Sequence, residues 1–311
     1  MDSKIFFQNC PAAVIAIAGH NSKTTAAMLA QIFNTYFATT ALDDKVHLVA
    51  AAADPAHQIY RDMDVLNDIS NIDIVLYILS DEQLANLAVN LPYLVIGETT
   101  DPNTNIAAVR STHLVAGTTF FLGRDLNSYA LANRSLAKNK HAFPDDLPFS
   151  LPPLQVVGNW QHESAAAAAL TATAFRFKAE LIQRALADFN ELPHHLDFIR
   201  EVNGVRYYDD SISTTPELAV VSVRTFNKPI IISAREFQAN LVKRQVIIPV
   251  AGSSPYRAES MVGDPLIDHA DSLTDATALA SILAQDGDVV LFVPAVPGLS
   301  AEEFVIEVNK L

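Results

Sequence analysis

The residues best suited to chemistry lie in a loop that follows the apolar run at residues 14–18. The loop and the helical turn after it consist of Gly19, His20, Asn21, Ser22, Lys23, Thr24 and Thr25. A strand, a loop and a helix in this order hold nucleotide phosphates, because backbone N–H groups and the lysine face the phosphate oxygens. The hydroxyl of Thr24 is then the ligand for Mg²⁺. The alternative is an ordinary strand-to-helix turn, in which Asn21 caps an exposed helix.

One residue of this loop is unusual for a phosphate site. Glycine commonly precedes the lysine, because the backbone there approaches a phosphate closely or takes a positive φ. Ser22 occupies that position in this chain. A serine costs about 1 kcal/mol there if φ is positive. The sequence therefore predicts a phosphate loop with one unfavourable residue.

Composition limits the classes to which the protein can belong. Its 311 residues are 50% hydrophobic, with a mean hydropathy of +0.19, which is enough for two domains with substantial cores. The net charge of −14 argues against a nucleic-acid partner, which needs clustered Lys and Arg. Cys10 is the only cysteine, so we expect no disulfide framework and no thiolate metal cluster. We find no signal pattern and no apolar run of about 18 residues, so we expect a cytoplasmic protein without membrane insertion.

Short aliphatic runs alternate with helical patterns along the chain, which is typical of parallel strands buried on both faces. We expect strands at residues 14–18, 46–51, 72–79, 93–96, 113–116, 205–208, 229–233, 246–250 and 289–293. We expect helices at residues 24–37, 127–137, 164–186, 216–226 and 275–284. The sequence therefore predicts an α/β fold, with a P-loop domain at residues 1–190 that has a mainly parallel sheet and a smaller Rossmann-like domain at residues 191–311.

Residues 192–217 carry the most specific motif of the chain. They include Leu-Pro-His-His, then Asn-Gly-Val, then Asp-Asp-Ser-Ile-Ser-Thr-Thr-Pro. This run resembles the junction between the central and C-terminal domains of the Mur ligases, and it is closest to the type that adds D-glutamate in peptidoglycan synthesis. The loop at residues 19–25, the segment at 158–166 and the run at 288–295 look like further segments of that family. The resemblance implies a central domain at residues 1–190 and a C-terminal domain at residues 191–311.

The resemblance also implies a reaction and a set of binding residues. Mur ligases join an acid to an amine with ATP and Mg²⁺, through an acyl phosphate that the amine attacks. The positions that bind the nucleotide in the family correspond here to the loop at residues 19–25, Trp160, Gln161, His195, Asp209 and Asp210. Trp160 and Gln161 lie in the segment that touches adenine in the family, and one of the two aspartates is the expected ribose contact.

The chain departs from the family where the chemistry is done. About a dozen residues precede the first expected strand, so we expect the family's N-terminal UDP-binding domain to be missing. Tyr77 is interpreted as standing where the family has a glutamate that binds Mg²⁺, and a neutral phenol is a poor ligand for that cation. Asn133, four residues after Tyr129, stands where a carbamylated lysine is expected. His195 stands where the family has an arginine.

These departures favour a divergent homologue, a pseudoenzyme whose ancestral reaction is ATP-dependent amide bond formation and whose ligation is weakened or lost. One alternative is an active ATP-dependent ligase or amidating subunit for a different substrate, with a protein partner in place of the missing domain. Another is a non-enzymatic scaffold in cell-wall assembly.

Some of the candidate residues also have a purely structural interpretation. Asp209 and Asp210 end an expected strand, and the alternative to a ribose contact is an ordinary turn. His194 and His195 belong to a linker surface in the simpler interpretation, because no second cluster of metal-ligating residues accompanies them. Trp160 either packs in the core or stacks on a purine.

Overall fold

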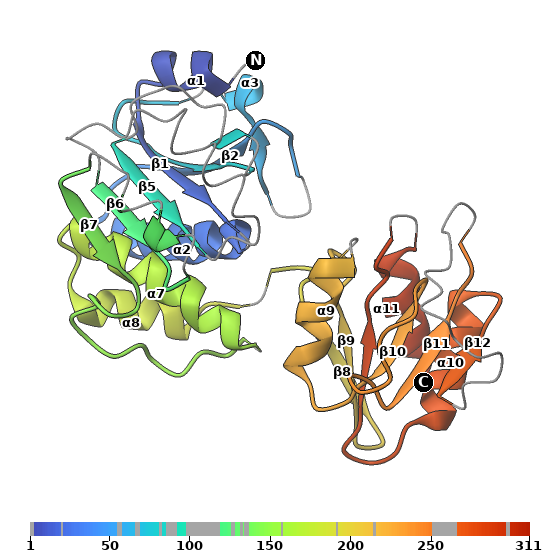
Figure 1. The fold of residues 1–311 in the computed structure, drawn as a ribbon. Coiled ribbons are helices and arrows are strands. Elements are labelled where there is room, and N and C mark those ends of the chain that lie inside the picture. The colour runs from blue at the N-terminus through green and yellow to red at the C-terminus, as the bar shows by residue number, and fades with distance from the viewer. Residues whose placement is uncertain are drawn as a thin grey trace. The chain divides into compact units, whose positions relative to one another are not determined.

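The computed structural model describes residues 1–311 except 1–2, 20, 55–57, 66–68, 81–82, 85–91, 98–118, 126–127, 131–132, 134–136, 157, 191, 214–215, 251–265 and 297–298. Contacts divide the chain into two compact units, Met1–Asn190 and Glu191–Leu311, here called unit 1 and unit 2 (Figure 1). Each unit has its own sheet, and each is described by itself.

Unit 1 is built on a seven-stranded sheet in the order β3-β2-β4-β1-β5-β6-β7, in which every pair of neighbours is parallel. The strands are β1 (Ala13–Ala18), β2 (Val46–Ala50), β3 (Tyr60–Arg61), β4 (Ile74–Ile78), β5 (Tyr93–Ile96), β6 (Thr119–Leu122) and β7 (Asn139–Ala142). Because the strands are parallel, their carboxyl ends share one edge of the sheet, where ligands bind in open α/β sheets.

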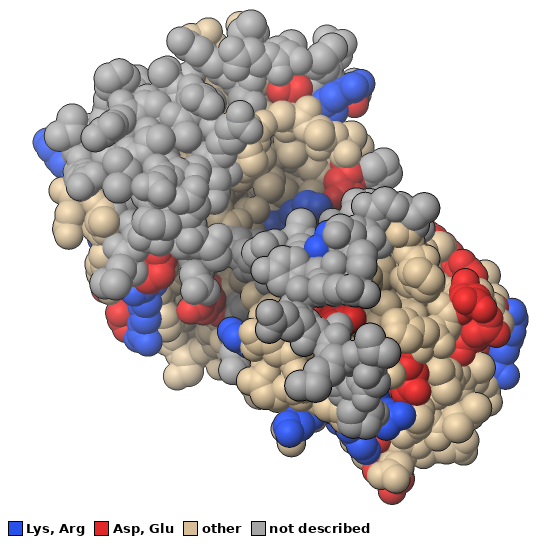
Figure 2. Space-filling model, turned by 45° about the vertical axis from the view of Figure 1, so that its right-hand side comes forward, with Lys and Arg blue, Asp and Glu red and all other residues tan. Residues whose placement is uncertain are grey.

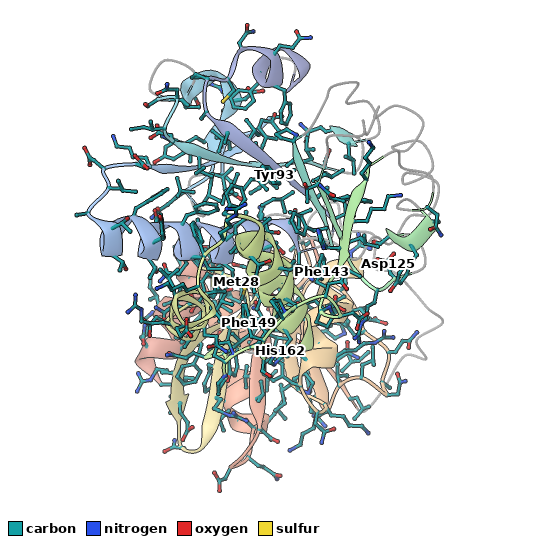
Figure 3. The ribbon with its side chains drawn as sticks, turned by 90° about the vertical axis from the view of Figure 1, so that its left-hand side faces the viewer. Met28, Tyr93, Asp125, Phe143, Phe149 and His162 are labelled. Atoms are coloured by element: carbon teal, nitrogen blue, oxygen red, sulfur yellow. The ribbon has the colours of Figure 1, made fainter. Side chains whose placement is uncertain are left out.

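Helices cover both faces of this sheet. They are α1 (Ser3–Asn9), α2 (Ser22–Thr40), α3 (Asp62–Val65), α7 (Asn159–Ala174) and α8 (Ala179–Ala187). One core cluster joins α2, α7 and α8 to one face, and Met28 and Phe143 belong to it (Figure 3). The alanines at 165–169 are each at most 1% exposed, so this part of α7 is tightly packed. Phe6 of α1 packs on the opposite face.

Several elements differ from the prediction. The single helix expected at residues 164–186 is two helices, α7 and α8, because Arg176 takes a φ of +62° and ends the first. Phe175 and Phe177 on either side of it each pack with their ring centroids 5.1 Å from that of Phe33, so aromatic burial offsets the break. The strand expected at residues 113–116 lies outside the described residues, and so does much of the helix expected at 127–137.

Unit 2 contains a six-stranded sheet in the order β12-β11-β10-β13-β9-β8. Its strands are β8 (Asp197–Val202), β9 (Val205–Asp209), β10 (Ile230–Ser233), β11 (Arg244–Ile247), β12 (Ile267–His269) and β13 (Val289–Phe292). Its helices are α9 (Pro216–Thr225), α10 (Leu273–Leu283) and α11 (Ala301–Lys310). All neighbours are parallel except β8 and β9. That hairpin turns at Asn203 and Gly204, which both have positive φ as a two-residue hairpin loop requires.

The predicted α/β class is therefore confirmed, with a parallel sheet in unit 1 and a mostly parallel sheet in unit 2. None of the described helices has the length and hydropathy needed to span a bilayer. Lys and Arg are interspersed with Asp and Glu among the described residues on the face in Figure 2.

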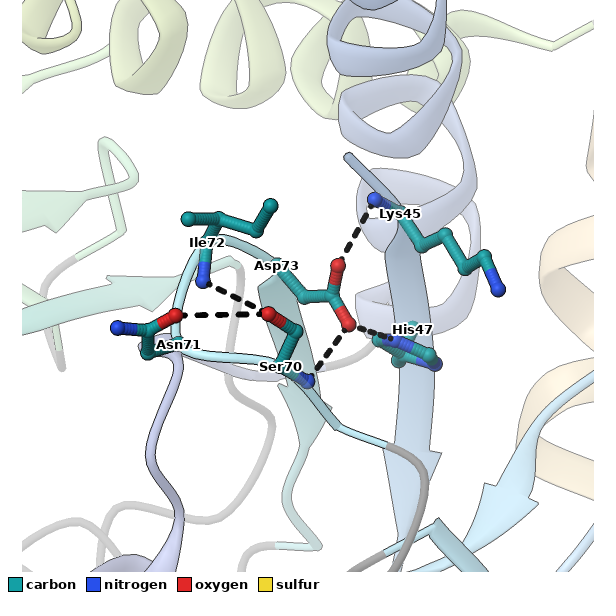
Figure 4. A network of polar contacts seen from close by, with 6 residues as sticks. All are labelled: Lys45, His47, Ser70, Asn71, Ile72 and Asp73. Carbon is teal, nitrogen blue, oxygen red and sulfur yellow. Dashed lines mark hydrogen bonds and ion pairs between the residues drawn. The ribbon is translucent and has the colours of Figure 1, made fainter. Parts of the chain in front are cut away.

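A buried polar network ties the amino ends of β2 and β4 together (Figure 4). His47 Nε2 lies 2.9 Å from Asp73 Oδ2, and the N–H groups of Ser70 and Lys45 donate to the same carboxylate at 2.9 and 3.1 Å. Burial by itself would raise the pKa of Asp73, but these donors more than offset it and lower that pKa. The network lies at the edge of the sheet opposite to the loop at residues 19–25.

Candidate functional site

The loop at residues 19–25 leaves the carboxyl end of β1 beside the neighbouring strand β5. Gly19 has a φ of +99°, and a Cβ atom there would lie 2.9 Å from the backbone nitrogen of Gly97. The Gly97 N–H donates to the carbonyl of Ala18 at 3.0 Å, which fixes the close approach of the two backbones. Only glycine satisfies both conditions at position 19.

Ser22 is the first residue of α2, and it is not among the described residues with positive φ. Its N–H donates to the Gly19 carbonyl at 3.2 Å. The strain expected from a serine at this position therefore does not arise. Asn21 occupies the N-cap position, but its side chain makes no capping hydrogen bond, so the capped-turn alternative lacks its main interaction. His20 lies outside the described residues.

Lys23 forms an ion pair that the sequence did not predict. Its Nζ donates to Asp54 Oδ2 at 2.6 Å. Asp54 follows β2, and the backbones of Asp54 and Ile59 exchange two hydrogen bonds of 2.9 Å. The two threonines that follow are buried, Thr24 at 1% and Thr25 at 5% exposed. The lysine and a carboxylate from a second strand therefore meet at this loop.

Tyr77 lies in β4 and is fully buried. Its ring centroid is 5.1 Å from that of Phe6 and 4.8 Å from that of Phe7, and its hydroxyl donates to Asp62 Oδ2 at 3.4 Å. Strand alternation puts it on the α1 face of the sheet, with the opposite face packed against α2.

The interpretation of Tyr77 as the counterpart of the family's Mg²⁺-binding glutamate stays a prediction. The next residue of β4, Ile78, lies on the other face of the sheet. Ile78 is 8% exposed and packs in the cluster that contains α2. Neither residue offers a metal ligand. Among the described residues no group of three His, Cys, Asp or Glu is placed to hold a metal ion.

Three further predicted site residues, Asn133, Trp160 and Gln161, lie in unit 1. Asn133 is helical and exposed, and its amide lacks the amine that a carbamate requires. Gln161 of α7 is fully buried, and Ser164 is 2% exposed. Within the described part of the chain the buried Ser164 hydroxyl has no hydrogen-bond partner. It lies in the segment that resembles the family's adenine-contacting segment. The side chain of Trp160 is not among those that the structure describes.

The aspartates of the junction motif face the linker of unit 2. Asp209 Oδ2 lies 2.7 Å from His194 Nδ1, and Asp210 Oδ1 accepts the N–H of Leu196 at 3.1 Å. Asp209 is 1% and Asp210 0% exposed, and burial raises the pKa of Asp210 to about 7. His194 and Leu196 have φ of +65° and +51°, so these contacts stabilise a strained linker. His195, predicted to contact nucleotide, is partly exposed beside them.

The structure brings the loop residues Gly19, Ser22 and Lys23 together at one edge of the sheet in unit 1. It brings His194, Asp209 and Asp210 together in unit 2. Sequence reasoning missed Asp54, for which the available signal was its position just after an expected strand of a parallel sheet.

A P-loop-type α/β unit followed by a Rossmann-like unit defines the class to which this fold belongs. Solved structures with a similar fold include the MurF ligase of Thermotoga maritima in complex with ADP, with a TM-score of 0.67 and 14% identity over 99% of this chain and 83% of that chain. The ligase MurC of the same organism gives a TM-score of 0.68 at 14% identity, over 99% and 78% of the two chains. A folylpolyglutamate synthase of Thermotoga maritima gives 0.61 at 14% identity, over 98% and 91%.

The sequence is also similar to that of a further Mur ligase. The chain is 32% identical over 145 residues to a UDP-N-acetylmuramoylalanine–D-glutamate ligase of Pelotomaculum thermopropionicum, covering 43% of this chain and 32% of that protein. It is 40% identical over 121 residues to the ligase of the same name from Geotalea uraniireducens, covering 36% and 27%. The chain thus spans about a third of the length of the curated relatives it matches, and no protein-family model matches it. The predicted resemblance to the Mur ligase family is therefore confirmed.

Proposed function

We propose that this protein is a divergent Mur-ligase-like protein that binds a nucleotide through the loop at residues 19–25, with ligation weakened or lost. The observation that carries the proposal is the contact of Gly19 with the Gly97 backbone, which sets the loop at the start of α2 with Lys23 in the first turn. Helix N-termini with a lysine favour phosphate, and that first turn has no acidic residue to repel it.

The residues of the loop fit the phosphates of ATP. Gly19 lets the loop turn close beside the Gly97 backbone, Lys23 supplies a positive charge and Thr24 supplies the hydroxyl that would hold Mg²⁺. Bound Mg-ATP would supply the phosphoryl group that activates an acid for attack by an amine. The chain's own part in that step is to orient the phosphates and to offset their charge.

Two substitutions support the loss of ligation. Tyr77, assigned to the position of the family's glutamate, is a buried phenol rather than a carboxylate, and Asn133, assigned to the position of its lysine, cannot form a carbamate. Each of those groups stabilises charge in the reaction that the family performs. The relatives support a cytoplasmic, cell-wall-related role in which this protein binds a nucleotide and its ligation is weakened or lost.

Calorimetry with ATP and Mg²⁺ tests the nucleotide site. We expect binding by the wild-type protein and a loss of about tenfold or more in affinity for Lys23→Ala, because removal of one charged hydrogen-bond donor costs about 1.5–3 kcal/mol. No binding by the wild type at high nucleotide concentration would exclude the site. Release of ADP that depends on an amino acid and an acid acceptor would show that ligation survives.

The second candidate is an active ATP-dependent acid–amino-acid ligase or amidating subunit on a different substrate. The fold likeness that favours it is the folylpolyglutamate synthase, of which this chain covers 91%. A protein partner would then complete the site. Screening acid acceptors for amino-acid-dependent ADP release, with and without proteins that co-purify with the chain, separates this candidate from the first.

A further inference from the structure

The lysine of the loop is held by a carboxylate that the loop motif does not explain. The 2.6 Å contact joins Lys23 Nζ to Asp54 Oδ2. Asp54 follows β2, which is separated from β1 by β4 in the sheet. Its backbone is fixed by the paired hydrogen bonds with Ile59. The carboxylate is therefore brought to the lysine by the sheet rather than by the loop.

This pair is partly open to solvent, with the Lys23 side chain 39% and the Asp54 side chain 26% exposed. Ion pairs with this exposure are weak, so Lys23 can exchange Asp54 for another anion. A nucleotide phosphate that arrives without a metal must compete with Asp54 for the lysine and is repelled by the same carboxylate. A divalent cation turns the repulsion between Asp54 and the phosphates into an attraction, because Mg²⁺ beside phosphates is commonly held by one or two protein carboxylates.

We propose that Asp54 couples nucleotide binding at this loop to a divalent cation. Without a cation Asp54 pairs with Lys23 and neutralises its charge. With a cation Asp54 binds the metal, and Lys23 binds the phosphates. The proposal rests on the proposed function. It gives the site a carboxylate from the end of β2, next to the strand β4 in which Tyr77 supplies none.

Calorimetric titration of the full chain with ADP, in EDTA and in excess Mg²⁺, tests this coupling. In the wild type we expect Mg²⁺ to strengthen ADP binding. In Asp54→Asn we expect the metal-free affinity to rise by up to about fivefold, because the competing ion pair is lost. We expect the ratio of the Mg²⁺ to the metal-free affinity to fall about tenfold, as for other carboxylates that support a metal.

The matched control is Asp64→Asn, which removes the same charge from an exposed pair with Arg61 in unit 1. It should leave the ratio of affinities unchanged. In Lys23→Gln/Asp54→Asn the gain in metal-free affinity over Lys23→Gln alone should be smaller than in the Lys23 background, because only the repulsion between Asp54 and the phosphates is relieved. If Asp54→Asn does not fold, Lys23→Gln carries the test, because Mg²⁺ must still strengthen ADP binding while Asp54 is present.

The outcomes separate the two proposals. An Asp54→Asn ratio within twofold of the wild-type ratio overturns the role of Asp54 and leaves the nucleotide site standing. A wild type that binds ADP equally well with and without Mg²⁺ also overturns the role of Asp54 and leaves the nucleotide site standing. A protein that binds ADP in neither condition overturns the nucleotide site, and the coupling with it.

Discussion

Gly19→Ala tests the geometry of the loop most sharply. The backbone at Gly19 has a φ of +99°, which costs an alanine about 1–2 kcal/mol. The new Cβ atom would also lie 2.9 Å from the nitrogen and 3.0 Å from the carbonyl carbon of Gly97, and overpacking of this kind costs about 1–3 kcal/mol. We therefore expect unit 1 to lose about 2–5 kcal/mol of unfolding free energy.

Urea unfolding measures this loss, because Trp160, the only tryptophan, lies in unit 1 and its fluorescence follows that unit. With a denaturant slope of about 2 kcal/mol/M, the midpoint should fall by about 1–2.5 M. Gly97→Ala is the matched control at the place where the two backbones approach, because among the described residues the nearest atom to its Cβ would be the Ala18 oxygen at 3.8 Å. We expect it to be neutral or to stabilise by up to about 1 kcal/mol.

Two results would refute this reasoning. A midpoint for Gly19→Ala within about 0.3 M of the wild-type value would mean that the loop moves to accept a side chain, so the close approach would not be a constraint. An equal loss of stability for Gly97→Ala would mean that neither backbone tolerates a side chain where Gly19 and Gly97 approach each other, so the requirement for glycine would not be specific to position 19.

Three further substitutions test other parts of the structure. Asp73→Asn should destabilise unit 1 by about 1–3 kcal/mol at pH 7. Because the pKa of Asp73 is lowered in the folded protein, the difference in stability between wild type and variant should shrink as the pH falls below about 4, and urea midpoints measure it. The raised pKa of Asp210, about 7, means that the native state holds a proton that the unfolded state has released, so unit 2 should lose stability as the pH rises from about 4 to about 7, by up to about 4 kcal/mol. Calorimetric scans at pH 5 and pH 8 should show that Asp210→Asn removes this dependence. Ser22→Gly should cost about 0.5–1 kcal/mol by Trp160 fluorescence, because Ser22 has no positive φ to relieve, and a gain in stability would contradict the loop geometry.

The parts of the fold that the sequence predicted well are those with a strong local pattern. The strands at 14–18, 93–96 and 289–293 are continuous apolar runs that are buried on both faces, and they lie within a residue of the observed strands. Strand β7 was missed because its polar residues Asn139–Ala142 carry no such pattern and pair on one side only, at the edge of the sheet.

The candidate site shows the same division. The loop at 19–25 was predicted because strand, loop and helix are adjacent in sequence. Asp54 was not, because 31 residues separate it from Lys23 and only the strand order brings the two together. The cost predicted for Ser22 depended on a positive φ, and it does not arise because Ser22 is the first residue of α2 and is not among the described residues with positive φ.

The central claim is that the loop at residues 19–25 binds nucleotide phosphate. Hydrogen exchange of the full chain, with and without Mg-ADP at saturating concentration, tests it most directly, because phosphate binding engages the N–H groups at the start of α2. We predict slower exchange in peptides that cover residues 19–25 and no comparable change in the β8–β9 hairpin. Unchanged exchange in the loop, whether or not ADP binds elsewhere, would contradict the account.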